Sequence, residues 1–247
     1  MKAPIFASRA SEDLLTGGQS LRRAFLAMPL RTAKRDTVIM SADDPAPHAF
    51  LLHRGFAYRS FSMPDGRRSI LDVLLPGDIT GLDYAVLGRG NHEIVAANTV
   101  GYRSMTGAAV RELMMSNPQI ALRTLALMGE TRWRTDRHMT VVTRLDARGR
   151  IAAFILGIYE RLRQRELILR PTFNLPLTQE QLADHLGITM VHVSRTLRRI
   201  REERLVLIDR QVVIILDLEE LRRAASGIPP LSAGGVTSAG SRDELAL

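Results

Sequence analysis

Cysteine is absent from the 247-residue sequence. The chain therefore forms no disulfide, has no thiol nucleophile, and cannot hold zinc or an iron–sulfur cluster through thiolates. Long apolar runs are missing too, because the stretches 151–158 and 212–216 fall far short of the ~20 residues that cross a bilayer. Charged residues interrupt the first segment, which lacks the layout of a signal peptide. We expect a cytoplasmic chain with no membrane partner.

The common sequence signatures of catalysis are also missing. The chain has no phosphate-binding loop, no Gly-x-Ser-x-Gly elbow and no His-Glu-x-x-His pair. Asp43 and Asp44 resemble paired catalytic carboxylates, but Pro45 beside them favours a surface turn. The sequence therefore predicts that the protein is not an enzyme.

Lysine is scarce, whereas arginine is abundant. Lys2 and Lys34 are the only lysines, so arginine supplies almost all the positive charge behind a net charge of +8. Arginine makes planar, bidentate contacts with phosphates and with the edge of guanine. A genome rich in G and C also favours arginine codons, so composition leaves both explanations open.

The residues from about 21 to 106 have the pattern of short strands. Turn signals at 64–66 (Pro-Asp-Gly) and 76–78 (Pro-Gly-Asp) separate apolar-rich segments of ten to fifteen residues. This spacing is typical of an antiparallel barrel or roll. Residues 1–20 are small and polar, and we expect them to be poorly ordered.

The apolar period changes from Ala109 to about Arg144, where apolar residues recur at threes and fours. This period predicts a long amphipathic helix, which we interpret as a seam between two subunits. Residues 226–247 are rich in Gly, Ser, Ala and Pro and are expected to form a disordered tail. The helical stripe consists of Leu122, Leu125, Met128, Thr135 and Met139.

Residues 177–208 have the pattern of two helices joined by a tight turn. Thr178 and Gln181 match a capping box at a helix start. Gly187 follows where a left-handed C-cap conformation is needed, and Thr189 is placed to cap the next helix. The small side chain of Ala183 lets the two helices cross closely, as in a helix-turn-helix. The expected buried positions are Leu182, Ala183 and Leu186 on the first helix and Val193, Leu197 and Ile200 on the second.

The opposite face of the second helix is basic. Val191, Arg195 and Arg199 lie on one line at a spacing of four, a face suited to the DNA major groove. Two strands around 209–210 then predict a wing. A generic helical hairpin with a solvated arginine face is the alternative to a DNA-reading helix.

These motifs resemble those of the Crp/Fnr family of bacterial regulators over about residues 20–220. The run from 177 to 206 carries most of the likeness, with the turn at 76–78, Asn117-Pro118 and the segment 145–156 adding to it. The resemblance implies an α+β fold with an antiparallel β-roll, cupin-like and cyclic-nucleotide-binding-like. The expected zones are a flexible N-terminus (1–20), a β-roll sensor domain (21–112), a dimerisation helix (113–146), a winged helix-turn-helix (147–225) and a tail (226–247).

The resemblance further implies a homodimer on near-palindromic double-stranded DNA, with RNA polymerase as a partner if the protein is an activator. Val191 and Met190 replace polar base-contacting residues of the cyclic AMP receptor, whereas Arg195 is retained and can bind guanine O6 and N7. The expected base-reading residues are Met190, Val191, His192, Ser194 and Arg195. The expected phosphate contacts are Thr178, Gln179, Thr189, Arg198 and Arg199.

The same resemblance argues against the family's known effectors. Cyclic-nucleotide-binding members have Gly-Glu and Arg-Ser or Arg-Thr where this chain has 81–82 (Gly-Leu) and 91–92 (Asn-His). A buried phosphate without these partners is costly, so cyclic AMP is not expected. The lack of cysteine excludes the oxygen sensors' iron–sulfur cluster. We assign a weak effector pocket to Gly81, Leu82, Asn91, His92, Thr135 and Asp136.

We predict no metal and no resident cofactor. Haem, through His92 or His138, is the remaining redox alternative. A ligand sensor that acts through protein–protein contact, with a vestigial helix-turn-helix, is the competing function.

Overall fold

A computed structural model describes residues 5–225, which fold into two compact units. Within that range the first unit comprises residues 5–61 and 73–132, and the second comprises 62–72 and 133–225. The predicted tail at 226–247 lies outside the described residues. No helix of the described part is long and apolar enough to span a membrane.

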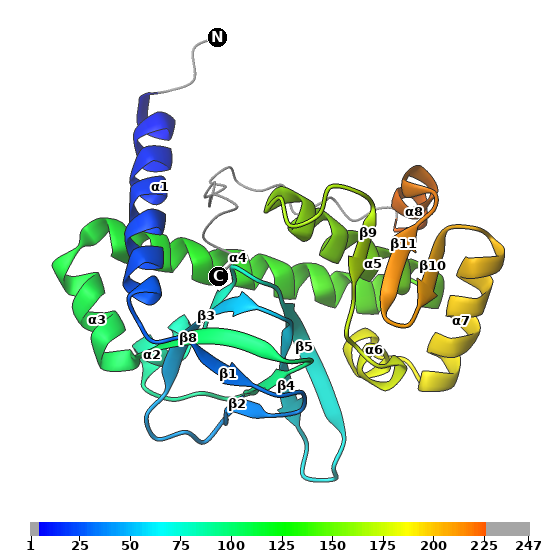
Figure 1. The fold of residues 1–247 in the computed structure, drawn as a ribbon, viewed down its shortest axis with the longest axis horizontal. Coiled ribbons are helices and arrows are strands. Elements are labelled where there is room, and N and C mark those ends of the chain that lie inside the picture. Colours follow the sequence, from blue (N-terminus) through cyan, green and yellow to red (C-terminus); the bar gives the residue numbers. More distant parts are fainter. Residues whose placement is uncertain (1–4, 226–247) are drawn as a thin grey trace. The chain divides into compact units, whose positions relative to one another are not determined.

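The first unit contains two antiparallel sheets, in the strand orders β1-β8-β3-β6 and β2-β7-β4-β5 (Figure 1). Phe50, Tyr84, Ile94 and Val100 belong to the buried core that draws on strands of both sheets. The predicted antiparallel roll is thereby confirmed. The elements of this part of the chain are α1 (Ile5–Leu26), β1 (Arg31–Ala33), β2 (Val38–Met40), β3 (His48–Arg54), β4 (Ala57–Ser62), β5 (Arg68–Leu74, whose residues 68–72 are counted in the second unit), β6 (Ile79–Thr80), α2 (Leu82–Leu87), β7 (Glu93–Ala96), β8 (Val100–Thr106), α3 (Gly107–Ser116) and the first part of α4 (Pro118–Arg144).

Helix α1 corrects the prediction that residues 1–20 are poorly ordered, because it begins at Ile5. Leu21 and Phe25 are fully buried in a second core that includes Leu51 of β3. A Cβ on Gly17 would meet the carbonyl oxygen of Gln119 at 2.1 Å, so the backbones of α1 and α4 approach closely. Leu21 and Phe25 lie in the last two turns of α1, and their partner Leu51 is far away in sequence, so these packing contacts had no local signal.

The predicted helical stretch from Ala109 to Arg144 is two helices rather than one. The side-chain oxygen of Asn117 accepts hydrogen bonds from the backbone N–H groups of Gln119 and Ile120 at 3.0 and 3.2 Å. Pro118 occupies the first position of α4, where its missing N–H has no intrahelical acceptor anyway. The capped Asn-Pro step therefore ends α3 and starts α4.

The second unit is a winged helix-turn-helix, as predicted. Strands β10, β11 and β9 form a three-stranded antiparallel sheet. Helix α5 buries Ile151, Ile155 and Ile158 in the unit, and α7 stands beside the β10–β11 hairpin (Figure 1). Its elements are the end of α4, α5 (Ala147–Gln164), β9 (Thr172–Asn174), α6 (Gln179–Leu186), α7 (Met190–Glu202), β10 (Val206–Asp209), β11 (Val212–Ile215) and α8 (Leu218–Ala224).

Candidate nucleic-acid interface

Helix α6 begins with the predicted capping box. The Thr178 hydroxyl accepts from the Gln181 backbone N–H at 3.1 Å, and the Gln181 side-chain oxygen accepts from the Thr178 backbone N–H at 2.9 Å. Leu182, Ala183 and Leu186 are buried, as expected. Two free N–H groups are thereby satisfied and the start of α6 is fixed.

Gly187 ends α6 in the left-handed conformation, with φ of +64°. Arg150 of α5 reinforces this turn, because its Nη1 donates to the carbonyls of Leu186 and Gly187 at 3.0 and 3.3 Å. Its Nε donates to the carbonyl of Leu145 at 2.9 Å. Arg150 thus holds both the turn and the start of α5 in place.

One face of helix α7 is buried against the rest of the second unit. The Thr189 hydroxyl accepts from the backbone N–H of His192 at 3.2 Å, which confirms the predicted cap. Val193 and Ile200 are 0% and 1% exposed, whereas Leu197 is half-buried. Thr196 is buried as well, a position that the apolar pattern did not include.

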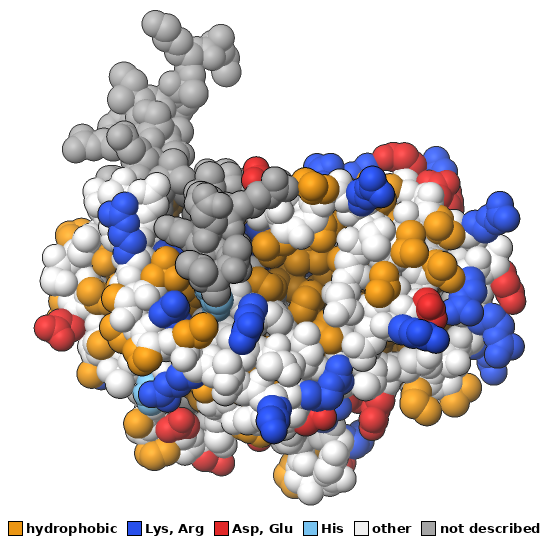
Figure 2. All heavy atoms as spheres, in the orientation of Figure 1, with side chains coloured by type: hydrophobic (Ala, Val, Ile, Leu, Met, Phe, Trp, Pro, Cys, Tyr) orange, Lys and Arg blue, Asp and Glu red, His pale blue; other side chains and the backbone are white. Residues whose placement is uncertain are grey.

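The free face of α7 presents the residues expected to read DNA, and all five are exposed. Met190 and Val191 are neighbours on this face and are 55% and 63% exposed. Arg195 and Arg198 make no hydrogen bond or ion pair within residues 5–225. Figure 2 shows basic side chains gathered over α7. The helix therefore offers two uncommitted guanidinium groups beside an apolar patch.

Arg199 differs from its neighbours because Glu203 binds it. The Nε of Arg199 lies 2.7 Å from a carboxylate oxygen of Glu203, whose other oxygen accepts from Arg148 of α5 at 2.8 Å. Hydrogen bonds from Arg148 and then Arg199 lower the pKa of Glu203. Arg148 also reaches Glu220 of α8 at 3.4 Å. This network joins α5, α7 and α8 and holds one of the predicted phosphate contacts.

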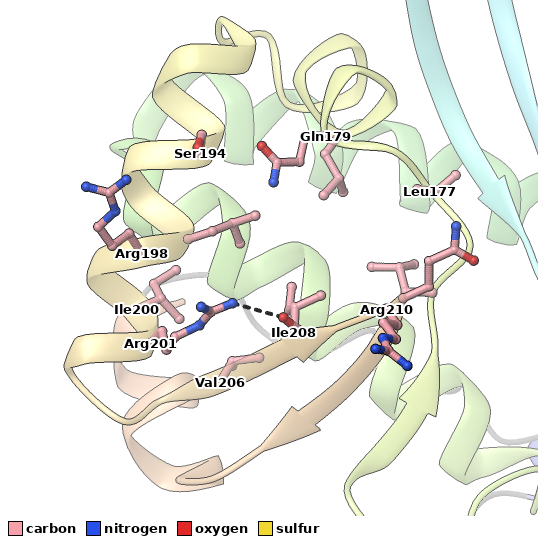
Figure 3. Close-up of a pocket in the computed structure, with 13 residues that line it drawn as sticks. Leu177, Gln179, Ser194, Arg198, Ile200, Arg201, Val206, Ile208 and Arg210 are labelled. Carbon is pink, nitrogen blue, oxygen red and sulfur yellow. Dashed lines mark hydrogen bonds between the residues drawn. The ribbon is translucent and has the colours of Figure 1, made fainter.

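A cavity of about 410 Å³ lies between α6, α7 and the wing hairpin (Figure 3). Apolar side chains that include Ile200, Val206 and Ile208 line it, and polar side chains that include Gln179 and Arg210 also border it. Arg201 also lines it, and its Nη2 donates to the carbonyl of Ile208 at 3.0 Å, the dashed line in Figure 3. The cavity therefore combines an apolar lining with cationic and amide groups.

The wing turns through Arg210 and Gln211, which have φ values of +43° and +71°. Asp209 and Val212 pair directly on either side, so the loop has two residues. Positive φ at both positions is the pattern of a type I′ hairpin turn, and non-glycine residues adopt it at a cost. The turn presents both side chains at the exposed tip.

The second unit contains a pair of stacked histidines, His185 on α6 and His138 on α4. The ring of His185 lies 4.2 Å from that of His138 at 17°, and its Nδ1 is 2.9 Å from the carbonyl of Ile70. Burial lowers the pKa of His138 to about 4, and His185 adds to the shift. Burial also lowers the pKa of His185. Arg68 Nη2, near Ile70 in sequence, lies 2.7 Å from the Asp184 carboxylate. Residues 62–72 are therefore tied to α6 at two places.

The predicted effector residues divide between the two units. Gly81, Leu82, Asn91 and His92 lie in the first unit, and Thr135 and Asp136 lie in the second, exposed on α4. Tyr84 lies on α2, two residues after Leu82, and its hydroxyl donates to the His92 carbonyl at 3.2 Å. This hydrogen bond joins α2 to the segment that contains Asn91 and His92. His92 is 3% exposed, and its Nδ1 lies 2.8 Å from Asn91 Oδ1. No group of three or more metal-ligating side chains occurs in the described part of the chain.

Known proteins match both halves of the chain. A family model described as a Crp-like helix-turn-helix domain matches residues 149–224, and one described as a cyclic nucleotide-binding domain matches residues 30–117. The transcriptional activatory protein AadR of Rhodopseudomonas palustris is 30% identical over 196 residues, which are 78% of this chain and 79% of AadR. The chain belongs to the Crp/Fnr family of transcription regulators. The predicted resemblance is confirmed.

Further comparisons agree with this Crp/Fnr assignment. Nitrogen fixation regulation protein FixK of Bradyrhizobium diazoefficiens is 32% identical over 158 residues, covering 63% of this regulator and 64% of FixK. The structure of FixK2 from Bradyrhizobium japonicum has a TM-score of 0.75 and 21% identity, and covers 82% of this chain and 100% of that one. It shows a shared fold. These relatives are named as regulators, in agreement with the prediction that the chain is not an enzyme.

The sequence did not predict the roles of several residues that shape the winged helix-turn-helix of this Crp/Fnr regulator. Arg150 and Arg148 act across elements, so nothing in their local sequence indicated their partners. The wing turn was predicted at 209–210 and lies one residue later, at Arg210 and Gln211, because Asp209 still pairs with Val212. Both turn residues adopt positive φ although neither is glycine or asparagine, so their residue types did not mark the turn.

Proposed function

We propose that this Crp/Fnr regulator binds a near-palindromic double-stranded DNA site as a homodimer, with α7 in the major groove. The observation that carries the proposal is the free face of α7, where Arg195 and Arg198 have no partner among the described residues. The opposite face of the same helix is buried, so this basic face is presented rigidly. A rigid basic helix preceded by a capped helix and a tight turn is suited to the major groove.

The two arginines have different roles in this proposal. Arg195 lies one helical turn after Val191 and donates a bidentate pair of hydrogen bonds to guanine O6 and N7. Met190 and Val191 contact thymine methyl groups, and His192 and Ser194 lie within the same reading face. Phosphates are contacted by Thr178, Gln179, Thr189 and Arg198, while Arg199 reaches a phosphate only by sharing its guanidinium with Glu203.

The cavity between α7 and the wing supports a wider backbone contact. Gln179 and Arg210 border it and lie on different elements, α6 and the wing turn (Figure 3). The sugar–phosphate backbone combines an apolar sugar with a charged group, which matches an apolar lining with cationic and amide groups. We therefore add Arg210 to the residues that hold phosphates.

The homodimer is supported by the exposed apolar face of α4. Leu122, Leu125, Trp133 and Met139 are between 40% and 60% exposed, although such side chains are usually buried. Their spacing of three, eight and six places them along one side of a helix. Exposed apolar side chains aligned along one helix are typical of a protein interface. A second copy of α4 would cover it with the same side chains.

Substitution of Arg195 tests the reading face. Arg195→Ala should weaken binding to a footprinted site upstream of the protein's own gene by about 1–3 kcal/mol and reduce discrimination at one base pair. Fluorescence anisotropy at fixed salt measures both effects. Arg163→Ala, on the exposed side of α5, should bind like the wild type. Unchanged operator affinity in the Arg195→Ala protein would remove α7 from the major groove.

Arg198 should behave differently, because a phosphate contact is indifferent to sequence. Arg198→Ala should weaken specific and random duplexes alike and should reduce the slope of log K against log salt by about 1 for each subunit. Salt titrations with both duplexes measure this. A loss confined to the specific duplex would make Arg198 a base reader instead.

We further infer that the regulator acts in the cytoplasm without cyclic AMP, an iron–sulfur cluster or any other resident cofactor, and contacts RNA polymerase where it activates. The absence of cysteine and the sequence at 81–82 and 91–92 support this. Absorbance and native mass spectrometry of the purified protein test it. A Soret band would establish haem, and a small added mass would reveal another ligand.

A further inference from the structure

Strand β4 places an arginine inside the roll. Its register with β7 sets Ala57 opposite Ala96 and Arg59 opposite Ile94. Directly opposed residues of antiparallel strands share one face of the sheet, as do residues two apart on one strand. Ala57, Ala96 and Ile94 all belong to the core that draws on both sheets. Arg59 therefore lies on the inner face of the roll.

Arg59 is half-buried, and one nitrogen of its guanidinium group has no acceptor in the protein around it. Its Nε is buried and has no hydrogen-bond partner among residues 5–225. No carboxylate of the described residues forms an ion pair with it. Buried donors are nearly always satisfied, and an unsatisfied one on a charged group is especially costly. The position is therefore suited to an acceptor that comes from outside the chain.

Tyr84 and His92 provide the surroundings of this charge. Tyr84 is 2% exposed, and its ring centroid lies 4.6 Å from that of His92. Burial raises the pKa of the Tyr84 hydroxyl and Asp83 adds to the rise, while the charge of Arg59 opposes it. Arg59 thus lies within electrostatic range of the phenol. The Tyr84 hydroxyl donates to the His92 carbonyl, and its oxygen accepts nothing from the Arg59 Nε, which has no acceptor among the described residues.

The other residues of the expected effector pocket do not supply this charge. None of Gly81, Leu82 and Asn91 carries a charge. Gly81 also excludes any side chain, since a Cβ there would meet the carbonyl oxygen of His48 at 2.5 Å, and its φ is +75°. The charge for an anionic ligand in the roll therefore comes from β4, not from these loop positions.

We propose that Arg59 anchors an effector site in the roll that takes a small organic monoanion, a carboxylate joined to an apolar body. One guanidinium group balances one negative charge, and its planar fork matches a carboxylate in a bidentate pair. The inner core around it is aromatic and aliphatic, with Phe50, Leu74 and Tyr84 among its members. An apolar body is the part of a ligand that matches such surroundings, with one polar anchor to fix its orientation. The site belongs to the first unit and does not depend on the proposed DNA contacts.

Binding is tested on the full-length protein with acetate, butyrate and benzoate, which share the carboxylate and differ in apolar size. Inorganic phosphate and cyclic AMP serve as comparison anions. Melting temperature and calorimetric titration should show binding that tightens from acetate to benzoate. In Arg59→Met the benzoate affinity should fall roughly 10–100-fold, as expected for loss of a charged hydrogen-bond partner. Arg59→Lys should be intermediate, and the exposed Arg89→Met should match the wild type.

The fold of the variant is checked separately. Because the Nε of Arg59 has no partner, unliganded Arg59→Met should melt no lower than the wild type. A clearly lower melting temperature would indicate a structural role and contradict the proposal. The Nε–H resonance that disappears in Arg59→Lys identifies Arg59 by NMR, and benzoate should shift it in the wild-type protein.

Three results overturn the proposal. The first is a wild-type protein that none of the three carboxylates stabilises or shifts. The second is undiminished benzoate binding in Arg59→Met. The third is binding of phosphate or cyclic AMP in preference to every carboxylate. None of these readouts involves DNA, so failure here is distinct from failure of the DNA-binding proposal.

Discussion

At the residue scale, identical side chains on one helix face have different surroundings. Arg195 and Arg199 are one turn apart, and the sequence assigned them to one line. Glu203 lies 2.7 Å from Arg199, however, while Arg195 has no partner among the described residues. The spacing of four between Arg199 and Glu203 is a local signal, whereas the second partner of Glu203, Arg148, comes from another helix and was not predictable from local spacing.

The buried histidine pair makes stability depend on pH. Burial and then His185 hold the pKa of His138 at about 4, below its ordinary value of 6.5. Between these values the unfolded chain binds more protons than the folded one, so the stabilisation is present above pH 6.5 and is lost as the pH falls. The free energy of unfolding should drop by up to about 2 kcal/mol from pH 7 to pH 5 through His138 alone.

Urea unfolding at both pH values measures this drop, and His138→Leu should make it smaller. His185 should retain part of it, because burial also lowers the pKa of His185. An equal drop in His138→Leu would assign the pH dependence to other groups.

At the element scale, helix ends were the most predictable features. The capping box of α6, the glycine at 187 and the threonine cap of α7 all lie where the sequence placed them. Each depends on residues within four positions, so local sequence contains the whole interaction. Helix α1 was not predicted, because its anchoring contacts are with α4 and β3, far away in sequence.

Gly187 offers a clean test of the turn between α6 and α7. An added Cβ has no neighbour closer than 3.8 Å, so a substitution here changes only the backbone energy. At φ of +64°, Gly187→Ala should cost about 1–2 kcal/mol in urea unfolding. Gly187→Asn should cost less, because asparagine tolerates the left-handed region. Equal losses for the two variants would point to the side chain instead of the backbone.

At the scale of the whole molecule, the apolar face of α4 indicates assembly. The stripe expected from the sequence is largely exposed in the single chain, with Leu125 at 60% and Met139 at 55%. Helical periodicity reveals that a face is apolar, but it does not reveal what covers that face. Only the structure shows that the chain itself leaves it open.

Introducing charge on this face should separate the subunits. Leu125→Glu combined with Trp133→Glu should shift the protein from dimer to monomer in sedimentation velocity, because each charge would be buried against its own copy. Met115→Glu makes the same kind of change at an 81% exposed methionine on α3 and should leave the dimer intact. A double variant that sediments as a dimer would place the subunit contact elsewhere.

The sequence by itself determined the family and the order of the β-roll, the long helix and the winged helix-turn-helix. It also determined the helix ends, because these depend on short-range patterns and turn chemistry. The tertiary structure decided which side chains remain available. It brought Arg148 of α5 to Glu203, left Arg195 and Arg198 without partners among the described residues, and buried the Nε of the half-buried Arg59 without an acceptor. Charge and burial at a residue depend on distant segments that pack around it, and one sequence without its fold does not specify those neighbours.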